Sequence, residues 1–585
     1  MTAIEVLHNT FGYDSFRTIQ ENVIDSVLAG HDTLALMPTG GGKSLCFQVP
    51  TMVMASEGKP SLCLVITPLI ALMKDQVENL RKHNIHAAAI YTGQSLDQQQ
   101  AALDNCQFGP YHFLYISPER LESETFRKRL TQLPIGLIAV DEAHCISQWG
   151  YDFRPSYLHI AAIRESIHCP ILALTATATP QVVEDICERL SAFHNDGLNR
   201  QRLNDELMND ELTNGMRVYA QSFERKNLQY IVRYTDKKDE QLTHILSCVR
   251  GSAIVYVRNR KRAQELSELL APYSADFYHA GLTAKERSDK QSAWKTGKTR
   301  VIVCTNAFGM GIDKPDVRLV IHYDLPDSIE AYFQEAGRAG RDGKTAYAVL
   351  LYNPEDKVNA RKRVANNYPT KEFIEDVYHK TCDFFTIGAG SGLGHSFALH
   401  MDDLVRVMHL PVLPTYAALH ILSQAGYIDF EEDQEMRARV QLKVTSSQWK
   451  QYSLSPEEAQ LLETLMRRYT GIFSELQYID LDTLLPYSST PLPPHTLLAG
   501  LAARGLLIYI PRTCACRFTL TQERQESIFL PKRVYEDRKE QYVERLRSMV
   551  EYAEQTQFCR SQLLLQYFGQ SDAPVCGTCD VCRSR

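Results

Sequence analysis

The alternation of short apolar runs with helix-like segments is the feature that most limits how this chain can fold. Runs of this kind are typical of parallel strands that helices cover on both faces. The first stretch contains the runs Thr33–Met37, Ser61–Thr67, His112–Ser117, Gly136–Val140 and Ile171–Thr175. The second stretch contains Ser252–Val257, Arg300–Thr305, Arg318–Tyr323 and Ala346–Tyr352. Each set suits one α/β domain, so we predict two parallel-sheet domains in tandem, with a ligand cleft between them.

The length and charge describe a large globular protein. At 585 residues the chain is too long for one core, because domains usually hold about 100–200 residues. The net charge of −7 argues against a generally basic surface but leaves room for a local track of cations that binds phosphates. Arg258, Arg260, Lys261 and Arg262 form one such cluster, although charge runs are more often solvated surface.

Targeting signals are lacking in this sequence. The N-terminus shows no basic, apolar and small-residue sections of a signal peptide, and no apolar run approaches the roughly 18 residues of a membrane span. We therefore expect a cytoplasmic protein with no membrane partner. In that reducing compartment the fifteen cysteines favour free thiols or metal ligands over disulfides.

A glycine-rich loop follows the first apolar run and opens a helix-like segment. Its glycines allow a tight turn that points successive backbone N–H groups at phosphate oxygens, and the helix start adds a favourable dipole. Lys43 would reach the β- and γ-phosphates, and the Ser44 hydroxyl would help to hold Mg²⁺. The opening position is Met37 in place of the usual Gly or Ala. The predicted nucleotide-binding residues of the loop are Thr39, Gly40, Gly41, Gly42, Lys43 and Ser44.

Two acidic residues end the apolar run Gly136–Val140. Asp141 fits the role of a carboxylate that holds the metal, and Glu142 fits that of a base that orients the attacking water. An Asp-Glu pair at a strand end is weak evidence alone. Combined with the phosphate loop, it predicts hydrolysis of ATP with Mg²⁺.

The order of these motifs resembles superfamily 2 helicases, and their details resemble the RecQ family of DNA helicases. The further blocks that carry the likeness include Phe11–Gln20, Thr67–Gln76, Cys145–Pro155, Thr175–Thr179 and Gln334–Gly343. The block Cys145–Pro155 matches the aromatic-rich loop of RecQ proteins. The resemblance covers roughly residues 5–355, although Asn306 departs from the RecQ pattern.

The resemblance assigns roles to residues outside the phosphate loop. It implies that Arg17 and Gln20 contact the adenine. In the block Gln334–Gly343 it implies catalytic roles for Gln334, Arg338 and Arg341, with Arg341 as the arginine finger. An arginine held by the second domain reaches the phosphate only when the cleft is closed, so ATP would favour the closed state.

The resemblance also implies a set of residues that couple ATP to single-stranded DNA, whose bases stack on aromatic side chains in a basic groove. This set comprises His144, Trp149, Arg154, Thr175 and Thr177. For a tryptophan, packing in the core is the ordinary alternative.

Four cysteines near the end of the chain have the spacing of metal ligands: Cys559, Cys576, Cys579 and Cys582. Thiolates two residues apart can bind one ion from a tight turn, and a fourth from a preceding helix completes a tetrahedral site. We predict structural Zn²⁺ here. The preceding residues resemble the zinc-binding helices of RecQ proteins, but in that family the module usually follows the second motor domain directly, whereas here a long segment intervenes.

The predicted fold is α/β, with two tandem RecA-like parallel-sheet motor domains, mainly helical winged-helix-like accessory domains and a C-terminal zinc-binding helical module. Beyond about residue 355 the segments His400–Glu432 and Ser455–Leu520 each suggest a few helices and a short strand pair, which other small helical domains would also fit. The expected domain limits are 1–205, 206–355, 356–445, 446–530 and 531–585.

The resemblance implies an ATP-dependent DNA helicase that unwinds duplexes in the 3′-to-5′ direction during DNA repair and recombination. Expected partners are single-stranded DNA, tailed or forked duplexes, single-stranded DNA-binding proteins and recombination proteins, at the nucleoid of a bacterial cytoplasm. The alternatives are a DNA-stimulated translocase or remodeller, an RNA helicase and a silent DNA-binding scaffold. The presence of Lys43, Asp141, Glu142 and Arg341 argues against the scaffold, and the aromatic-rich loop and the zinc module argue against an RNA helicase.

Overall fold

The computed structural model divides into two compact units. Unit 1 comprises Met1–Ala360 together with Val543–Arg585, and unit 2 comprises Arg361–Tyr542. The C-terminal residues therefore fold with the first part of the chain. The structure describes residues 1–38, 40–91, 94, 96–147, 154–164, 166–191, 211–213, 215–309, 314–436, 438–444, 452–469, 471–473, 477–479, 481, 494–510 and 513–585.

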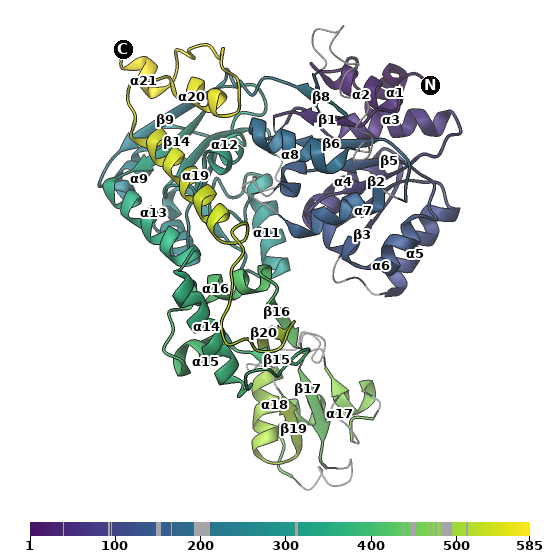
Figure 1. The fold of residues 1–585 in the computed structure, drawn as a ribbon, viewed down its shortest axis with the longest axis vertical. Helices are drawn as coiled ribbons and strands as arrows, with labels where there is room; N and C mark the ends of the chain where they lie inside the picture. Colours follow the sequence, from purple (N-terminus) through teal and green to yellow (C-terminus); the bar gives the residue numbers. More distant parts are fainter. Residues whose placement is uncertain are drawn as a thin grey trace. The chain divides into compact units, whose positions relative to one another are not determined.

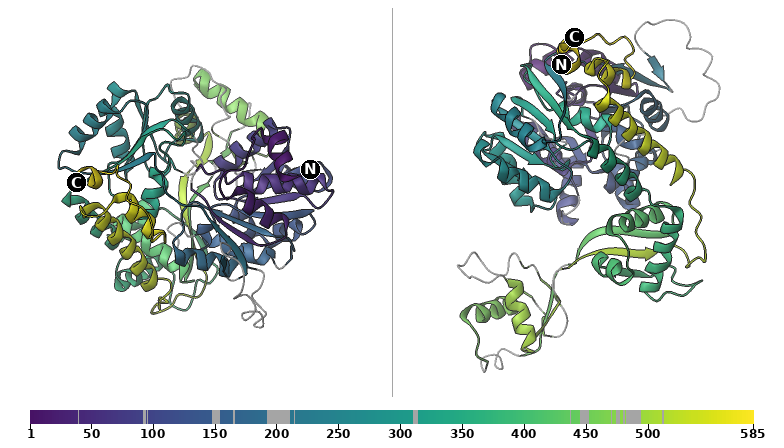
Figure 2. Two further views of the ribbon diagram at one scale, coloured as in Figure 1. Left: turned by 90° about the horizontal axis from the view of Figure 1, so that it is seen from above. Right: turned by 90° about the vertical axis from the view of Figure 1, so that its left-hand side faces the viewer.

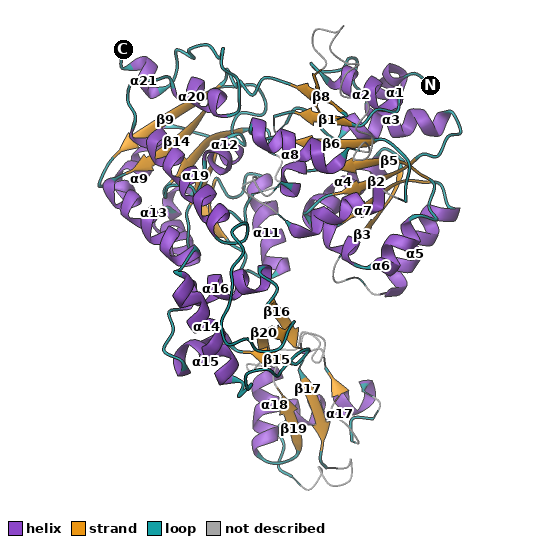
Figure 3. Ribbon diagram, in the orientation of Figure 1, coloured by secondary structure: helices purple, strands orange, loops and turns teal. Residues whose placement is uncertain are grey.

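Unit 1 contains two sheets flanked by helices (Figures 1 and 3). The first sheet has eight strands in the order β3-β4-β2-β5-β6-β1-β8-β7. Every neighbouring pair is parallel except β7 with β8. The strands are β1 (Thr33–Leu36), β2 (Leu62–Ile66), β3 (His86–Ile90), β4 (Tyr111–Ile116), β5 (Ile135–Val140), β6 (Ile171–Thr175), β7 (Glu211–Thr213) and β8 (Met216–Ala220).

Helices bury both faces of the first sheet. On one face, Phe113 and Leu174 pack with Ile24 and Phe47 in a single core, while Leu64 on the opposite face of β2 is equally buried. This burial explains why the central strands are apolar throughout instead of alternating with polar residues. The helices are α1 (Ala3–Phe11), α2 (Gln20–Leu28), α3 (Leu45–Ser56), α4 (Ile70–Lys82), α5 (Leu96–Phe108), α6 (Glu124–Leu130), α7 (His159–Arg164) and α8 (Pro180–Leu190).

Strand β8 belongs to the first sheet although it lies beyond residue 205, where we expect the first domain to end. It pairs in parallel with β1, and the Gln221 N–H beyond it donates to the Leu36 carbonyl at 2.9 Å. The first sheet therefore extends to Ala220. Between α8 and β8, residues 192–210 and 214 lie outside the described residues.

The second sheet has six parallel strands in the order β11-β12-β10-β13-β14-β9. Its strands are β9 (Leu228–Tyr234), β10 (Ser252–Tyr256), β11 (Ala275–Tyr278), β12 (Val301–Cys304), β13 (Val317–His322) and β14 (Ala346–Tyr352). Strand residues such as Val255 and Ile321 share a core with Leu242 and Leu266 of the helices. The helices are α9 (Lys238–Cys248), α10 (Arg260–Leu269), α11 (Ala284–Lys295), α12 (Ile329–Ala336) and α13 (Pro354–Asn367).

The C-terminal helices α19 (Glu536–Glu554), α20 (Arg560–Tyr567) and α21 (Asp580–Arg583) return to the second sheet. Both Figures 1 and 2 show these yellow helices beside the teal strands. Arg560 is buried and donates to Asp580 at 3.1 Å, and the other Asp580 oxygen accepts the Val232 N–H of edge strand β9 at 3.1 Å. The end of the chain thus satisfies a backbone group on a sheet edge, which is otherwise open.

Unit 2 contains two hydrophobic cores, each with a three-stranded sheet. The first core packs helices α14 (Lys371–Phe384), α15 (Met401–Val407) and α16 (Val412–Gln424) with strands β15 (Ser396–Leu399), β16 (Ile428–Met436) and β20 (Thr513–Leu520). The second packs helices α17 (Pro456–Arg468) and α18 (Pro494–Ala503) with strands β17 (Arg439–Leu442), β18 (Gln477–Tyr478) and β19 (Leu507–Ile510). The chain enters and leaves the second core through strands of the first.

The predicted fold class is confirmed: two parallel α/β sheets precede helical and antiparallel regions and a C-terminal four-cysteine cluster. Among the described residues, no single helix combines the length and apolar composition needed to cross a membrane; α15 and α16, which meet at a bend of 110°, reach them only as a pair.

Candidate functional site

The glycine-rich loop forms a tight turn between β1 and α3. Gly40 and Gly42 have φ angles of 84° and 81°, a left-handed conformation that favours glycine. A side chain at Gly42 would also displace the amide of Gln20, whose nitrogen lies too close to leave room for an added Cβ atom. Thr39 of the predicted set lies outside the described residues.

Gln20 holds the phosphate loop from α2. Its buried amide donates to the carbonyls of Gly41 at 3.3 Å and Gly42 at 3.1 Å, and its Oε1 accepts the backbone N–H of Arg17 at 2.8 Å. These bonds join the two predicted adenine-contacting residues to the phosphate loop. An adenine contact for either of them remains a prediction.

Ser44 is positioned by two glutamines that our sequence analysis did not assign to the nucleotide site. Gln76 of α4 donates to the Ser44 hydroxyl at 3.3 Å, and Gln48 of α3 donates to Gln76 at 3.3 Å. The signal for Gln76 was present, because it ends one of the family blocks. The resemblance implies that this block, Thr67–Gln76, touches DNA, so its link to the phosphate loop appears only in three dimensions.

Asp141 follows β5 at the edge of the sheet where the phosphate loop follows β1. Its Oδ2 accepts from the Thr67 hydroxyl at 3.4 Å, and its Oδ1 accepts the Glu142 N–H at 3.0 Å. Burial, and after it the Glu142 carboxylate, raises the pKa of Asp141 to about 6, while the Lys43 ammonium opposes the shift. The carboxyl and the loop lysine are therefore close enough to interact, as a shared phosphate and metal site requires.

A polar chain leads from the acidic pair to β6. The Glu142 backbone is left-handed at φ 48°, a strained conformation for a non-glycine residue that is typical of functional sites. Its carboxylate lies 3.4 Å from Nδ1 of His144, which is 1% exposed and also bonds the Thr175 hydroxyl at 2.9 Å. The Thr177 N–H donates to that hydroxyl at 3.3 Å.

Arg154, a predicted DNA contact, is only partly placed by the structure. Its backbone N–H bonds the Cys145 carbonyl at 2.9 Å, so the residue returns beside the acidic loop. Trp149 and the other residues of 148–153 lie outside the described residues.

The two arginines of the last family block occupy different places. A Cβ atom at Gly40 would lie 3.7 Å from Cγ of Arg341, so this side chain lies against the phosphate loop. Arg338 is only 4% exposed and lies beside Gly309 of the second sheet's own loops. Gln334 is half-buried on α12. The structure therefore brings Arg341 to the phosphate loop, and a phosphate contact for Arg338 stays a prediction.

The loop that carries Arg341 is held by residues that sequence reasoning missed. Arg225 donates to the carbonyls of Gly337, Ala339 and Gly340 at 3.2, 2.8 and 3.0 Å. Asn227 donates to the Gly340 carbonyl at 2.6 Å. Both come from the segment between β8 and β9, whose polar sequence carries no signal for this role.

The basic cluster Arg258–Arg262, at the start of α10, is largely paired with acids. Arg258 binds Asp327 at 2.7 Å and Arg262 binds Asp239 at 2.7 Å. These pairs favour the interpretation of the cluster as ordinary charged surface for those two residues.

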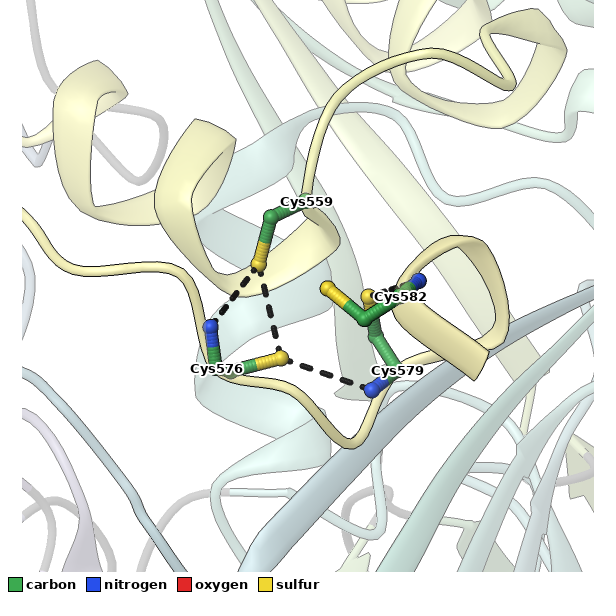
Figure 4. Close-up of side chains that lie close together, drawn as sticks. All are labelled: Cys559, Cys576, Cys579 and Cys582. Atoms are coloured by element: carbon green, nitrogen blue, oxygen red, sulfur yellow. Dashed lines mark hydrogen bonds between the residues drawn. The ribbon is translucent and has the colours of Figure 1, made fainter. Parts of the chain in front are cut away.

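The four cysteines of the C-terminal cluster converge on one point (Figure 4). Their Sγ atoms all lie within 4.8 Å of one another. A tetrahedron with Zn–S bonds of about 2.3 Å needs sulfurs about 3.8 Å apart, so the set fits zinc. Backbone N–H groups donate to the sulfurs, as from Arg560 to Cys579 at 3.4 Å and from Cys576 to Cys559 at 3.3 Å.

The electrostatics of the cluster also suit a cation. Burial would raise the pKa of Cys576, but the backbone N–H groups of Thr578 and Cys579 lower it to about 7. Burial raises the pKa of Cys559. One thiolate is thus available near neutral pH, and a bound metal would deprotonate the remaining ligands.

The comparisons with known proteins agree with this geometry. The family described as DEAD/DEAH box helicase matches residues 17–186, that described as Helicase conserved C-terminal domain matches 237–343, and that described as RecQ zinc-binding matches 517–583. "Probable ATP-dependent DNA helicase RecS" of Bacillus subtilis (strain 168) is 39% identical over 381 residues, which are 64% of this chain and 71% of that protein. The chain belongs to the RecQ family.

Two further relatives show the breadth of the RecQ likeness. "ATP-dependent DNA helicase RecQ" of Pasteurella multocida (strain Pm70) is 42% identical over 359 residues, or 61% of this chain and 53% of the relative. The chain thus spans about half the length of the bacterial RecQ proteins it matches. "Putative ATP-dependent RNA helicase R290" of Acanthamoeba polyphaga mimivirus is 37% identical over 370 residues, or 62% of each chain.

We predict that Cys579→Ser lowers the zinc content of this RecQ chain well below one ion per molecule and lowers its melting temperature. The substitution removes a buried ligand and the sulfur that accepts the Arg560 N–H, and metal binding and local folding are coupled. Metal analysis and thermal melting measure both effects. Cys248→Ser, at an exposed cysteine, is the matched control. A folded Cys579→Ser protein with full zinc would contradict the ligand set.

Proposed function

We propose that this RecQ-family chain is an ATP-dependent DNA helicase that moves 3′ to 5′. The observation that carries the proposal is the position of Arg341. Arg341, from the segment between α12 and β14 beside the second sheet, lies against Gly40 of the phosphate loop, which follows β1 of the first sheet. A nucleotide between them would bind the closed arrangement more tightly than an open one, and such differential affinity is what drives movement.

The residues around this contact have complementary roles in phosphoryl transfer. Lys43 and the loop N–H groups would bind the phosphates, and Glu142 would orient the attacking water. Ser44 and Asp141 would hold a Mg²⁺ ion, which supplies charge stabilisation to the phosphates when bound. Arg341 would stabilise the charge that develops on the transferred group.

The polar chain His144–Thr175–Thr177 offers a route from hydrolysis to DNA. It begins at the Glu142 carboxylate and ends in the loop after β6. We infer that Trp149 and Arg154 contact single-stranded DNA next to this route, because aromatic stacking and a cation suit an unpaired strand. The two cores of unit 2 would then act as winged-helix-like accessory domains. Their limits differ from the predicted 356–445 and 446–530, because β17 belongs to the second core and β20 returns to the first.

An RNA helicase is the second candidate, because one similar protein is named as a putative ATP-dependent RNA helicase. The match to the RecQ zinc-binding family and the relatives named as DNA helicases favour the DNA-helicase hypothesis. A role in repair and recombination, with single-stranded DNA-binding and recombination proteins as partners, follows from the same hypothesis.

The deciding test compares ATP hydrolysis by the purified chain alone, with single-stranded DNA and with RNA, followed by strand separation on 3′-tailed and 5′-tailed duplexes. We expect stimulation by DNA and unwinding of the 3′-tailed duplex only. Stimulation by RNA in preference to DNA would support the second candidate, and hydrolysis without strand separation would indicate a translocase.

We predict that Lys43→Ala lowers kcat for ATP by about a hundred-fold or more, because the charge that neutralises the transferred phosphate is lost. The melting temperature should stay within a few degrees of wild type. Lys59→Ala, at a surface lysine paired with Glu57, is the matched control and should hydrolyse ATP normally. Near-normal turnover by Lys43→Ala would contradict the active-site assignment.

We predict that the Mg²⁺ concentration required for nucleotide binding rises as the pH falls below about 6. The pKa of Asp141 is raised to about 6, so the carboxyl binds a proton below that pH, and Mg²⁺ must displace it. Affinity for the ion should therefore rise with pH through this range and then level off. Titrations with a fluorescent ATP analogue at about pH 5 and about pH 7.5 measure the change.

Asp141→Asn is the control for this experiment, because it keeps the titration of the nucleotide phosphates and loses that of the carboxyl. The pH dependence of the wild type minus that of Asp141→Asn isolates Asp141. Equal pH dependence in the two proteins would remove Asp141 from the metal site.

A further inference from the structure

One short segment joins the two sheets of unit 1 and contacts the phosphate loop, the zinc module and the finger loop. The finger loop is the segment 337–345 between α12 and β14, which carries Arg341. The joining segment runs from Gln221 to Asn227, between β8 and β9. If one sheet closes toward the other, the backbone of such a connection would have to change, so residues 221–227 would act as a hinge and are called the hinge segment below. Whatever packs against this hinge segment therefore influences closure.

The first end of the hinge segment lies beside the phosphate loop. Gln221 bonds the end of β1 through its N–H, and its buried Oε1 would lie 3.6 Å from a Cβ atom at Gly41. The other end holds the finger loop, since Arg225 and Asn227 bind the carbonyls next to Arg341. The segment thus links the two groups that must meet across ATP.

The middle of the hinge segment packs against the zinc module. Phe223 is 3% exposed, and its ring centroid lies 5.5 Å from that of Phe568, immediately after α20. Phe333 of α12 completes the cluster at 5.0 Å from Phe568 and 6.2 Å from Phe223. The Ser222 hydroxyl donates to Gln570 at 3.2 Å.

We propose that Phe568 is a positioning residue for ATP hydrolysis, acting through Phe223 and Arg225 to set the Arg341 loop against the phosphate. The inference rests on the proposed function. Packing of Phe568 against Phe223 fixes the hinge segment. Arg225 of that segment then holds the finger loop through its backbone carbonyls, and the finger loop directs the Arg341 guanidinium toward the phosphate. Misplacement of a catalytic group by about 1 Å can cost about a hundred-fold in rate, so a packing residue this far from the phosphate can control turnover.

A positioning role makes a kinetic prediction that a purely structural role does not. Removal of the Phe568 ring should lower kcat about ten-fold with little change in KM for ATP, because the finger acts in the transition state. The effect should disappear when Arg341 is absent. Arg341→Ala with Phe568→Ala should therefore hydrolyse ATP as fast as Arg341→Ala alone, within about two-fold.

The experiment measures kcat and KM for Phe568→Ala, Phe568→Leu, Arg341→Ala and the double variant, with zinc content and melting temperature for each. Phe568→Leu should retain most of kcat. Phe558→Ala is the matched control, since this phenylalanine is in the same module but 58% exposed, and it should behave as wild type. If Phe568→Ala loses zinc, Gln570→Ala takes its place in the cycle, because it removes only the partner of Ser222.

The outcomes separate the inference from the proposed function. A loss of kcat that multiplies with that of Arg341→Ala, or a change confined to KM or stability, would overturn the positioning role. A wild-type protein that hydrolyses ATP but separates no DNA strands would refute the helicase assignment and leave the cycle interpretable. Non-additive loss of kcat at constant KM and zinc content would establish the role.

Discussion

The parallel pairing of β5, β6 and β1 is the constraint on which the rest of the site depends. Three neighbouring parallel strands end at one edge, so the loops that follow them must meet there. The phosphate loop, the acidic pair and Thr175 come from segments far apart in sequence, and none can bind a nucleotide alone. Burial of the strands on both faces keeps this edge rigid while its loops remain free to carry polar groups.

The same edge accounts for the electrostatics of the site. Burial and the Glu142 carboxylate push Asp141 toward its neutral form, while Lys43 and the hydrogen bonds from the Glu142 N–H and the Thr67 hydroxyl oppose this shift. A site in this condition gains from any cation that enters it, because the ion relieves the repulsion between the two carboxylates. The left-handed backbone of Glu142 adds local strain at this edge, as is common in functional sites.

The sheets were predictable because their central strands are continuously apolar, and every apolar run identified in the sequence overlaps a strand. The strands that the sequence analysis missed, such as β3, β8 and β11, lie at or near sheet edges or are short and rich in small or polar residues. The cysteine cluster was predictable because ligand spacing is local. The contacts of the hinge segment could not be predicted, because Arg225 and Phe568 act through partners more than a hundred residues away in the sequence.

The distance between the second sheet and the zinc module in sequence has little physical consequence for their packing. The ends of unit 2 connect to α13 and α19, and in unit 1 Lys357 of α13 bonds Glu554 of α19 at 3.0 Å. Because the entropy of closing a loop grows only logarithmically, by about 0.6 kcal/mol per doubling, a long insertion hardly weakens such a contact. The zinc module stays on the second sheet through local contacts such as those that join Arg560, Asp580 and Val232. The long intervening segment leaves these contacts in place and supplies two additional cores.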